Sequence, residues 1–179
     1  MILVFDTETT DLIKNSLRPL ARQPRLMEFF GLKLDPKTLE EVGVISQMIN
    51  PGIPIPETSK EITKITDEMV AKAPRINDVI GTLAKEIESA SMVVAHNISY
   101  DIAVMNFEAA RCGVTINWPQ NLVCTVEATE WIKGHRLNLG SLHLELFGEP
   151  FTGAHRAEHD VRATARCFIE LVKRGEIVT

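Results

Sequence analysis

The chain has 179 residues, of which 45% are hydrophobic and 24% are charged. This length suits one domain, and we expect a single domain over residues 1–179. The composition is ordinary for a globular protein and excludes a disordered, collagen-like or repeat-built chain. The formal net charge of −5 at pH 7 argues against a broad basic surface that would bind duplex DNA without sequence preference.

The cysteines and the N-terminus indicate the cellular compartment. Cys112, Cys124 and Cys167 lie far apart and form no C-x-x-C pair, so we expect neither a disulfide framework nor a zinc knuckle. The apolar residues 2–5 are not preceded by the basic region of a signal peptide. No segment approaches the ~20 apolar residues that span a bilayer. We therefore expect a cytoplasmic protein without a membrane partner.

The first half of the chain predicts three strands. An apolar, β-rich run covers residues 2–5, and two further runs cover 26–34 and 42–49. The turn-forming residues 35–38 join the last two runs and predict an antiparallel hairpin. Between the first and second strands, the polar, proline-interrupted stretch 11–24 predicts a surface loop.

The second half alternates strands with helices. Apolar residues at a 3.6-residue period predict a helix that has Asn77 or Asp78 as its N-cap and reaches Ile87. The same criteria predict strands over 92–95 and 121–125, and helices over 98–109, 126–133, 138–147 and 156–173. A hairpin followed by alternating strands and helices indicates an α/β fold whose sheet has an antiparallel part.

Four acidic residues stand out against this framework. Asp6 and Glu8 lie two apart at the end of the first strand, so both point to one face, where their charges repel unless a cation neutralises them. Asp101 and Asp160 border the apolar stripes of their helices. Each acid alone is more typical of a solvated turn or an ordinary ion pair. Together they form the oxygen-only ligand set that a pair of Mg²⁺ or Mn²⁺ ions prefers.

Three blocks of sequence carry a family resemblance. They are Asp6-Thr-Glu-Thr-Thr10, His96-Asn-Ile-Ser-Tyr-Asp101 and His155-Arg-Ala-Glu-His-Asp160. In order and spacing they resemble the DnaQ-like, DEDD superfamily of 3′-to-5′ exonucleases, which includes the proofreading subunit (epsilon) of bacterial DNA polymerase III. A D-x-E motif alone is weak, whereas three ordered blocks on the expected elements are a strong signal. The resemblance implies a ribonuclease H-like fold with a mixed five-stranded sheet flanked by helices.

The third block indicates the DEDDh branch, which has a histidine five positions before the last aspartate; this position holds His155. The neighbouring His159 would face about 100° away from Asp160 on a helix, so we expect it at the surface or in an indirect role. Five residues are out of phase on a helix, and His155 must therefore lie in the loop before it. Gly153 favours such a loop.

The resemblance implies two-metal hydrolysis of a phosphodiester bond. Asp6, Glu8, Asp101 and Asp160 would hold two divalent cations, Mg²⁺ or Mn²⁺, and His155 would be the general base for the attacking water. The resemblance also implies that Thr9, Leu12 and Asn97 bind the substrate. Packing for Leu12 and helix capping for Asn97 remain alternatives.

Some positions depart from the family pattern or have an open role. Asp11 and Lys64 stand where glycine is common, and Tyr100 where phenylalanine is usual, which leaves the substrate preference open. The cations of the first loop either contact phosphates or are solvated; they are Lys14, Arg18, Arg22 and Arg25. We expect Arg156, Arg162 and Arg166 at the surface, and Trp118 and Trp131 in packing contacts. His96 is expected to be structural, and the sequence shows no evident partner for His135 and His143.

We therefore expect a 3′-to-5′ exonuclease that acts on single-stranded or frayed DNA ends, with a role in proofreading or DNA repair. An exoribonuclease of the same fold is the nearest alternative, because the sequence has no clear mark of 2′-hydroxyl recognition. A subunit that works mainly when bound to a polymerase is a second alternative. A catalytically inactive interaction module is disfavoured by the complete set of four acids and His155. The sequence does not indicate the oligomeric state.

Overall fold

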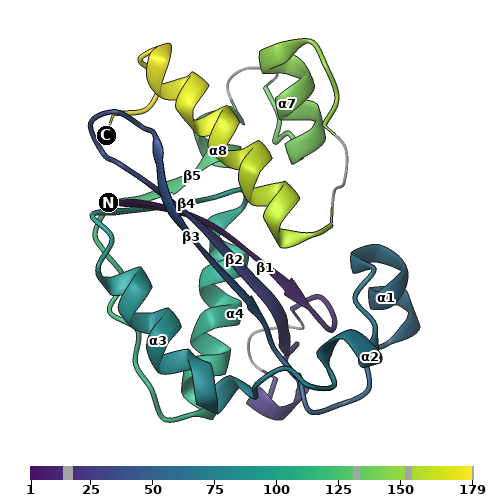
Figure 1. Ribbon diagram of the computed structural model, residues 1–179. Coiled ribbons are helices and arrows are strands. Elements are labelled where there is room, and N and C mark those ends of the chain that lie inside the picture. Colours follow the sequence, from purple (N-terminus) through teal and green to yellow (C-terminus); the bar gives the residue numbers. More distant parts are fainter. Residues whose placement is uncertain (14–17, 131–133, 152–154, 179) are drawn as a thin grey trace.

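The computed structural model describes residues 1–13, 18–130, 134–151 and 155–178 (Figure 1). Its sheet contains the five strands β1 (Ile2–Thr9), β2 (Leu26–Leu34), β3 (Glu41–Met48), β4 (Met92–Ala95) and β5 (Leu122–Cys124). They are ordered β3-β2-β1-β4-β5. β2 is antiparallel to both β1 and β3, whereas β4 is parallel to both β1 and β5. The expected mixed five-stranded sheet with an antiparallel part is confirmed.

The central strand is longer than predicted. β1 does not end at Phe5 but continues to Thr9, because β2 pairs with it along this length and places Phe30 opposite Asp6 and Glu28 opposite Glu8. The apolar pattern ended at the first acid, whereas the strand is held by backbone hydrogen bonds that do not depend on side-chain type. The two acids therefore lie within the sheet rather than after it.

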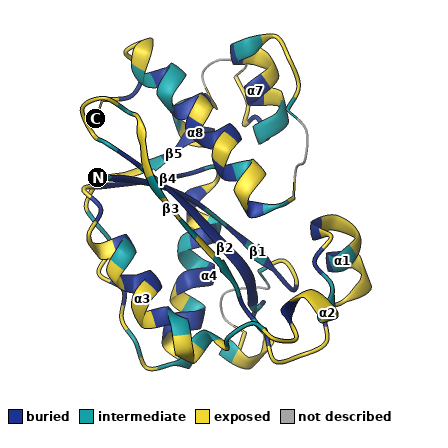
Figure 2. Cartoon of the chain, viewed as in Figure 1, coloured by how far each residue is buried: buried dark blue, intermediate teal, exposed yellow. Residues whose placement is uncertain are grey.

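Helices cover both faces of the sheet (Figure 1). α3 (Ile76–Glu88) and α4 (Ile98–Arg111) lie on one side, and α7 (Leu139–Phe147) and α8 (Ala157–Lys173) on the other. Alternation along β1 divides the core accordingly: Leu3 and Phe5 pack in the cluster of α3 and α4, and Ile2 and Val4 in the cluster of α8. β1, β2 and β4 are largely buried, whereas the edge strand β3 and the outer faces of the helices are exposed in part (Figure 2).

Three details differ from the expectations. The N-cap of α3 is Arg75 rather than Asn77 or Asp78; Asp78 lies one turn in and accepts a bond from the Arg75 backbone N–H at 3.0 Å. α5 covers only Thr125–Ala128, and residues 131–133 of the predicted helix 126–133, with Trp131, lie outside the described residues. The loop 11–24 contains one short 3₁₀ turn, Leu20–Arg22, while Lys14 is outside the described residues.

Two short helices were not predicted. α1 (Glu57–Thr63) and α2 (Asp67–Val70) lie beside the end of β1 (Figure 1). They are too short for an apolar period to be read from the sequence. A small separate cluster of Met27, Ile55, Ile65 and Val70 packs this segment against β2. α1 and α2 therefore form a wall next to the acidic end of β1.

All three cysteines are free, as expected. Among the described residues, none of the helices is both long and apolar enough to cross a membrane.

Replacing Phe168 with alanine is expected to lower the free energy of unfolding by about 3–5 kcal/mol, because this side chain is fully buried between α8 and the sheet. Urea unfolding measures the effect. Leu144→Ala in α7, where the side chain is 50% exposed, is the control and is expected to change it by about 0.5 kcal/mol or less. Equal losses in the two variants would contradict the packing described for α8.

Candidate active site

Asp6 and Glu8 project from β1 to the face that α8 covers. They share the alternation of Ile2 and Val4, which pack in the α8 cluster. β4 pairs with β1 only from Ile2 to Val4. The side of β1 next to the two acids is therefore left to side chains from the helices rather than to another strand.

α8 brings a third carboxylate to these two. One carboxylate oxygen from each of Asp6, Glu8 and Asp160 lies within 4.8 Å of the other two. All three are only partly exposed. This donor set consists of oxygen alone and is suited to a hard divalent cation such as Mg²⁺ or Mn²⁺ rather than to a metal that prefers sulfur or nitrogen ligands.

The fourth acid approaches from the opposite face. Asp101 lies in the first turn of α4, is 2% exposed and accepts a hydrogen bond from Thr7 Oγ1 at 2.6 Å. It is not one of the three residues whose oxygens gather, but its charge raises the pKa of Asp6. Thr7 therefore holds this carboxylate beside the group. The sequence signal for this contact is the alternation of side chains along β1, which turns Thr7 toward α4.

The carboxyl groups are electrostatically strained. Burial, and then the charge of Asp160, raise the pKa of Glu8 to about 8. Burial raises the pKa of Asp101 to about 7, against hydrogen bonds from Thr7 that lower it. Burial and the neighbouring carboxylates also hold the pKa of Asp6 well above its usual range. A bound cation would relieve this repulsion, so the site fits the metal ions that its donors favour.

His155 lies in the turn before α8, as its spacing from Asp160 requires. Its backbone N–H donates to Asp160 Oδ2 at 2.8 Å, and its backbone has a left-handed φ of 68°. Its exposed side chain lines clefts on both sides of the acidic group. Gly153, which favoured a loop here, lies outside the described residues. His159 is exposed and lines a different pocket.

Two clefts flank the carboxylates. One, of about 440 Å³, lies between the end of β1 and α1, and its lining includes Thr9, Leu12, Ile62 and His155. The other, of about 510 Å³, lies toward α7, and Asp6, Asp160 and His155 are among its lining residues. Because the acids lie between two open clefts, an extended ligand can reach them from either side.

The predicted substrate-binding residues differ in their placement. Thr9 is buried, and its Oγ1 lies 2.7 Å from the Tyr100 hydroxyl. Leu12 is 73% exposed at the mouth of the first cleft, so packing in the core does not explain it. Asn97 occupies the N-cap position of α4 with a φ of 69°, but its side chain forms no capping bond. Lys64 ends α1 with a φ of 60°, a left-handed conformation that glycine adopts most readily.

Several expected surface or unpartnered residues have specific contacts. Arg156 is not simply a surface residue: its guanidinium binds the buried carboxylate of Glu28. His143 is buried, with Nδ1 2.8 Å from the backbone oxygen of Glu149. His96 Nδ1 lies 2.9 Å from Thr125 Oγ1. Glu28 is the only charged residue in the run 26–32, and this was the sequence signal that could have indicated its role.

Trp118 packs beside Phe5 at a ring-centroid distance of 6.0 Å, as expected for a packing residue. The cations at 18, 22 and 25 are exposed or half-buried. Arg162 and Arg166 are exposed and form ion pairs with Glu41 and Glu149, respectively.

Two-metal enzymes, nucleases among them, use such a cluster of carboxylates, which lies here at the end of the central strand. The model of the exonuclease family (RNase T) matches residues 3–168, and the chain belongs to this family. It is 28% identical, over 171 residues, to the DNA polymerase III subunit epsilon of Treponema pallidum, an alignment that covers 94% of this chain and 74% of that protein. It is 32% identical to DNA polymerase III PolC-type of Listeria welshimeri, over 95% of this chain and 11% of that protein.

Solved structures support the fold. The nuclease domain of 3′hExo, a DEDDh family member bound to rAMP, has a TM-score of 0.79 at 16% identity, over 97% of this chain and 92% of that one. Exonuclease X, in complex with 5′ overhanging duplex DNA, has a TM-score of 0.70 at 23% identity, over 99% and 95%. The chain spans only 11 to 12% of the length of the first PolC-type relatives, so it corresponds to one part of those proteins.

In the absence of divalent cations, the free energy of unfolding is expected to fall as the pH rises from 6.5 to 8. Glu8 keeps its proton up to about pH 8 when folded but loses it near pH 4.5 when unfolded, so in this window the folded state binds more protons and its stability decreases with pH. His96, whose pKa burial lowers from 6.5 to about 4, is neutral when folded and half-protonated at pH 6.5 when unfolded, so it opposes this fall only at the lower end of the window. Urea unfolding in a chelator measures the slope.

Glu8→Gln is the control for this prediction, because it removes the titrating group at nearly constant volume. The slope in this variant is expected to be shallower by up to about 1.4 kcal/mol per pH unit. Adding Mg²⁺ is expected to stabilise the unmodified protein more at pH 8 than at pH 6.5, since the carboxylates are then ionised. An identical slope in both proteins would exclude Glu8 as its source.

Proposed function

We propose that this protein is a 3′-to-5′ exonuclease that removes nucleotides from single-stranded or frayed DNA ends with the help of two divalent cations, Mg²⁺ or Mn²⁺. The observation that carries the proposal is the convergence of Asp6, Glu8 and Asp160 oxygens within 4.8 Å, with His155 bonded through its backbone to Asp160. The sequence blocks that led to this expectation lie on three elements distant in the chain. The first and third blocks supply the three oxygens, and the second supplies Asp101, whose charge acts on Asp6. A two-metal site requires such a gathering of carboxylates.

The four carboxylates act as metal ligands in this proposal. Asp6, Glu8 and Asp160 are grouped closely enough to share one ion, and Asp101, which Thr7 holds, would join the ligands of the second. Bound cations would supply the positive charge and Lewis acidity that a polyanionic substrate and its transition state need. This charge explains how a chain with a net charge of −5 can act on DNA.

His155 acts as the general base. It accepts a proton from a water molecule whose oxygen then forms a bond to the phosphorus, while the bond from phosphorus to the 3′ oxygen of the preceding nucleotide breaks and that oxygen takes up a proton. Histidine is the side chain that most often serves as a general base. The exposed His155 lies in a turn that opens on both clefts, which lets it reach a phosphate between them.

The cleft at the end of β1 is the proposed site of the terminal nucleoside. Its lining combines the exposed Leu12 with the hydroxyl groups of Thr9 and Tyr100. Ser59 of α1 fixes the wall of this cleft to the residue after β1, because its Oγ donates to the Thr10 backbone oxygen at 2.5 Å. An apolar side chain against the base and hydroxyls near the sugar are suited to binding a nucleotide without reading its sequence.

A second candidate function is that of a nuclease subunit bound to a DNA polymerase. It is favoured by the match to a polymerase III epsilon subunit over 74% of that protein. The nuclease site and its ligands are the same in both cases. An exoribonuclease is the remaining alternative, and a neighbour of similar fold was solved with rAMP. Matched DNA and RNA oligonucleotides in one assay separate these substrates.

Purified protein with Mg²⁺ or Mn²⁺ is expected to shorten 5′-labelled oligonucleotides stepwise from the 3′ end, and DNA faster than RNA. Asp6→Ala and Asp101→Ala are expected to abolish most activity because each removes a metal ligand. His155→Ala is expected to lower kcat by about 10²–10⁴-fold, the usual contribution of a general base. Gel electrophoresis of the labelled products measures each rate.

His159→Gln is the matched control, since this histidine is also exposed and lies four residues from His155. We expect it to keep most of the activity. A larger loss in this variant than in His155→Ala would reverse the assignment of the base. Full nuclease activity in Asp6→Ala would overturn the proposed site. Release of the 5′ label in the first product, with no ladder of shortened labelled strands, would overturn the direction.

Leu12→Ala is expected to raise KM for single-stranded DNA several-fold with little change in kcat, because Leu12 lines the cleft but is remote from the proton transfer in the proposed mechanism. Its 73% exposure means that the protein should keep its stability. Steady-state kinetics and thermal unfolding measure the two effects. An unchanged KM would indicate that the terminal nucleoside does not use this cleft wall.

A further inference from the structure

Glu28 is a buried acid that packing alone does not explain. It lies in β2 directly opposite Glu8 and is 4% exposed. The following residues on the same face of this strand, Phe30 and Leu32, are apolar and belong to the core. A carboxylate in such a place loses its hydration and lies near a second carboxylate, and both effects are destabilising unless it is paired.

The partners of Glu28 come from one short segment. Arg156 Nη2 lies 3.0 Å from Glu28 Oε1, and Arg156 Nε lies 3.2 Å from Oε2. The backbone N–H of Ala157, the first residue of α8, donates to Oε2 at 3.2 Å. One carboxylate therefore receives a two-pronged guanidinium and an otherwise unpaired N–H at the beginning of the helix.

This segment also carries His155. The His155 N–H donates to Asp160 Oδ2 at 2.8 Å, so three consecutive residues, 155 to 157, are each fixed by a carboxylate. His155 has a left-handed backbone, which costs a non-glycine residue free energy and persists only where neighbouring contacts impose it. The bonds to Glu28 are contacts of that kind, since they hold the residue that follows His155.

We propose that Glu28 and Arg156 are positioning residues, which fix the turn before α8 and thereby place His155 and Asp160 against Asp6 and Glu8. This inference rests on the proposed function, because it assigns a task to the pair within the same site. Neither residue touches the substrate in this arrangement. Their effect passes through the backbone of residues 155–157 and through the start of α8.

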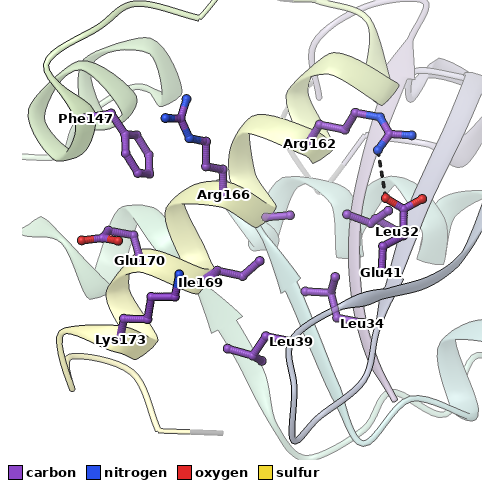
Figure 3. Close-up of a pocket in the computed structure, with 11 residues that line it drawn as sticks. Leu32, Leu34, Leu39, Glu41, Phe147, Arg162, Arg166, Ile169, Glu170 and Lys173 are labelled. Atoms are coloured by element: carbon purple, nitrogen blue, oxygen red, sulfur yellow. Dashed lines mark hydrogen bonds and ion pairs between the residues drawn. The ribbon is translucent and has the colours of Figure 1, made fainter.

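A second ion pair on the same helix provides a matched comparison. Arg162 Nη1 lies 3.1 Å from Glu41 Oε2 and joins α8 to β3 (Figure 3). Both side chains are nearly half exposed, and they line a groove of about 350 Å³ with Leu34 and Ile169. Of the described residues that line this groove, none belongs to the proposed metal or base set. This pair joins the same two layers without holding the turn of His155.

The test uses Glu28→Gln, Arg156→Lys and the double variant, with Glu41→Gln and Arg162→Lys as controls. Arg156→Lys keeps the charge but loses the two-pronged geometry, so it isolates positioning from electrostatics. Each variant of the Glu28–Arg156 pair is expected to lower kcat on single-stranded DNA by about 10–100-fold, the usual effect of residues that orient a metal site. KM is expected to change less than threefold. The double variant should be no slower than the slower single variant, because both changes break one contact.

Hydrogen exchange of backbone amides in the metal-free protein gives a readout that does not need activity. Loss of the pair is expected to speed exchange at Ala157 and His155 by about tenfold or more, while the amide of Ala165 in the middle of α8 stays protected. The control variants should leave both kcat and the exchange of His155 unchanged. These local changes separate positioning from a general loss of stability.

Unchanged kcat and unchanged exchange in Glu28→Gln and Arg156→Lys would overturn the inference. It would also be overturned if the control variants lost as much activity, or if exchange increased throughout α8, since the pair would then only stabilise the fold. If the unmodified protein shows no nuclease activity, the proposed function fails, and the exchange rates at His155 and Ala157 still decide whether Glu28 and Arg156 fix this turn.

Discussion

The mutual repulsion of carboxylates at the end of β1 is the constraint on which the rest of the site depends. Burial and like charge raise the pKa of Glu8 to about 8 and hold that of Asp6 well above its usual range. A fold that served stability alone would not place such groups together. The arrangement becomes favourable when divalent cations neutralise it. The interactions that hold the acids in place therefore belong to the function as much as to the fold.

The two faces of the sheet hold different acids in place. Alternation along β1 directs Asp6 and Glu8 toward α8, which supplies Asp160, and directs Thr7 toward α4, where it holds Asp101. The early end of the pairing with β4, at Val4, leaves room for both approaches. Glu28 and Arg156 then connect β2 to the start of α8. Each acid is thus held by an element whose core packing is independent of the metal site.

Sequence patterns predicted the regular elements well where a period was long enough to read. β2 and β4 begin and end as predicted, and α8 begins one residue later than expected. The patterns failed where tertiary contacts decide: β1 runs on past its apolar residues because β2 pairs with it, and α1 and α2 are too short to show a period. Arg156 was expected at the surface because its buried partner, Glu28, is 128 residues away in the sequence, and no local pattern indicates that the two residues meet.

The sequence by itself determined the mixed sheet, the family and the identity of the four acids and His155 as candidates, because strand alternation, helical period and motif spacing are local properties of the chain. Only the tertiary structure decided that three carboxylates gather while Asp101 lies to one side, that His155 takes a left-handed turn beside two clefts, and that Glu28 accepts bonds from Arg156 and Ala157. These facts depend on which faces of distant elements meet. Distances between residues remote in sequence are set by packing, which no local pattern records.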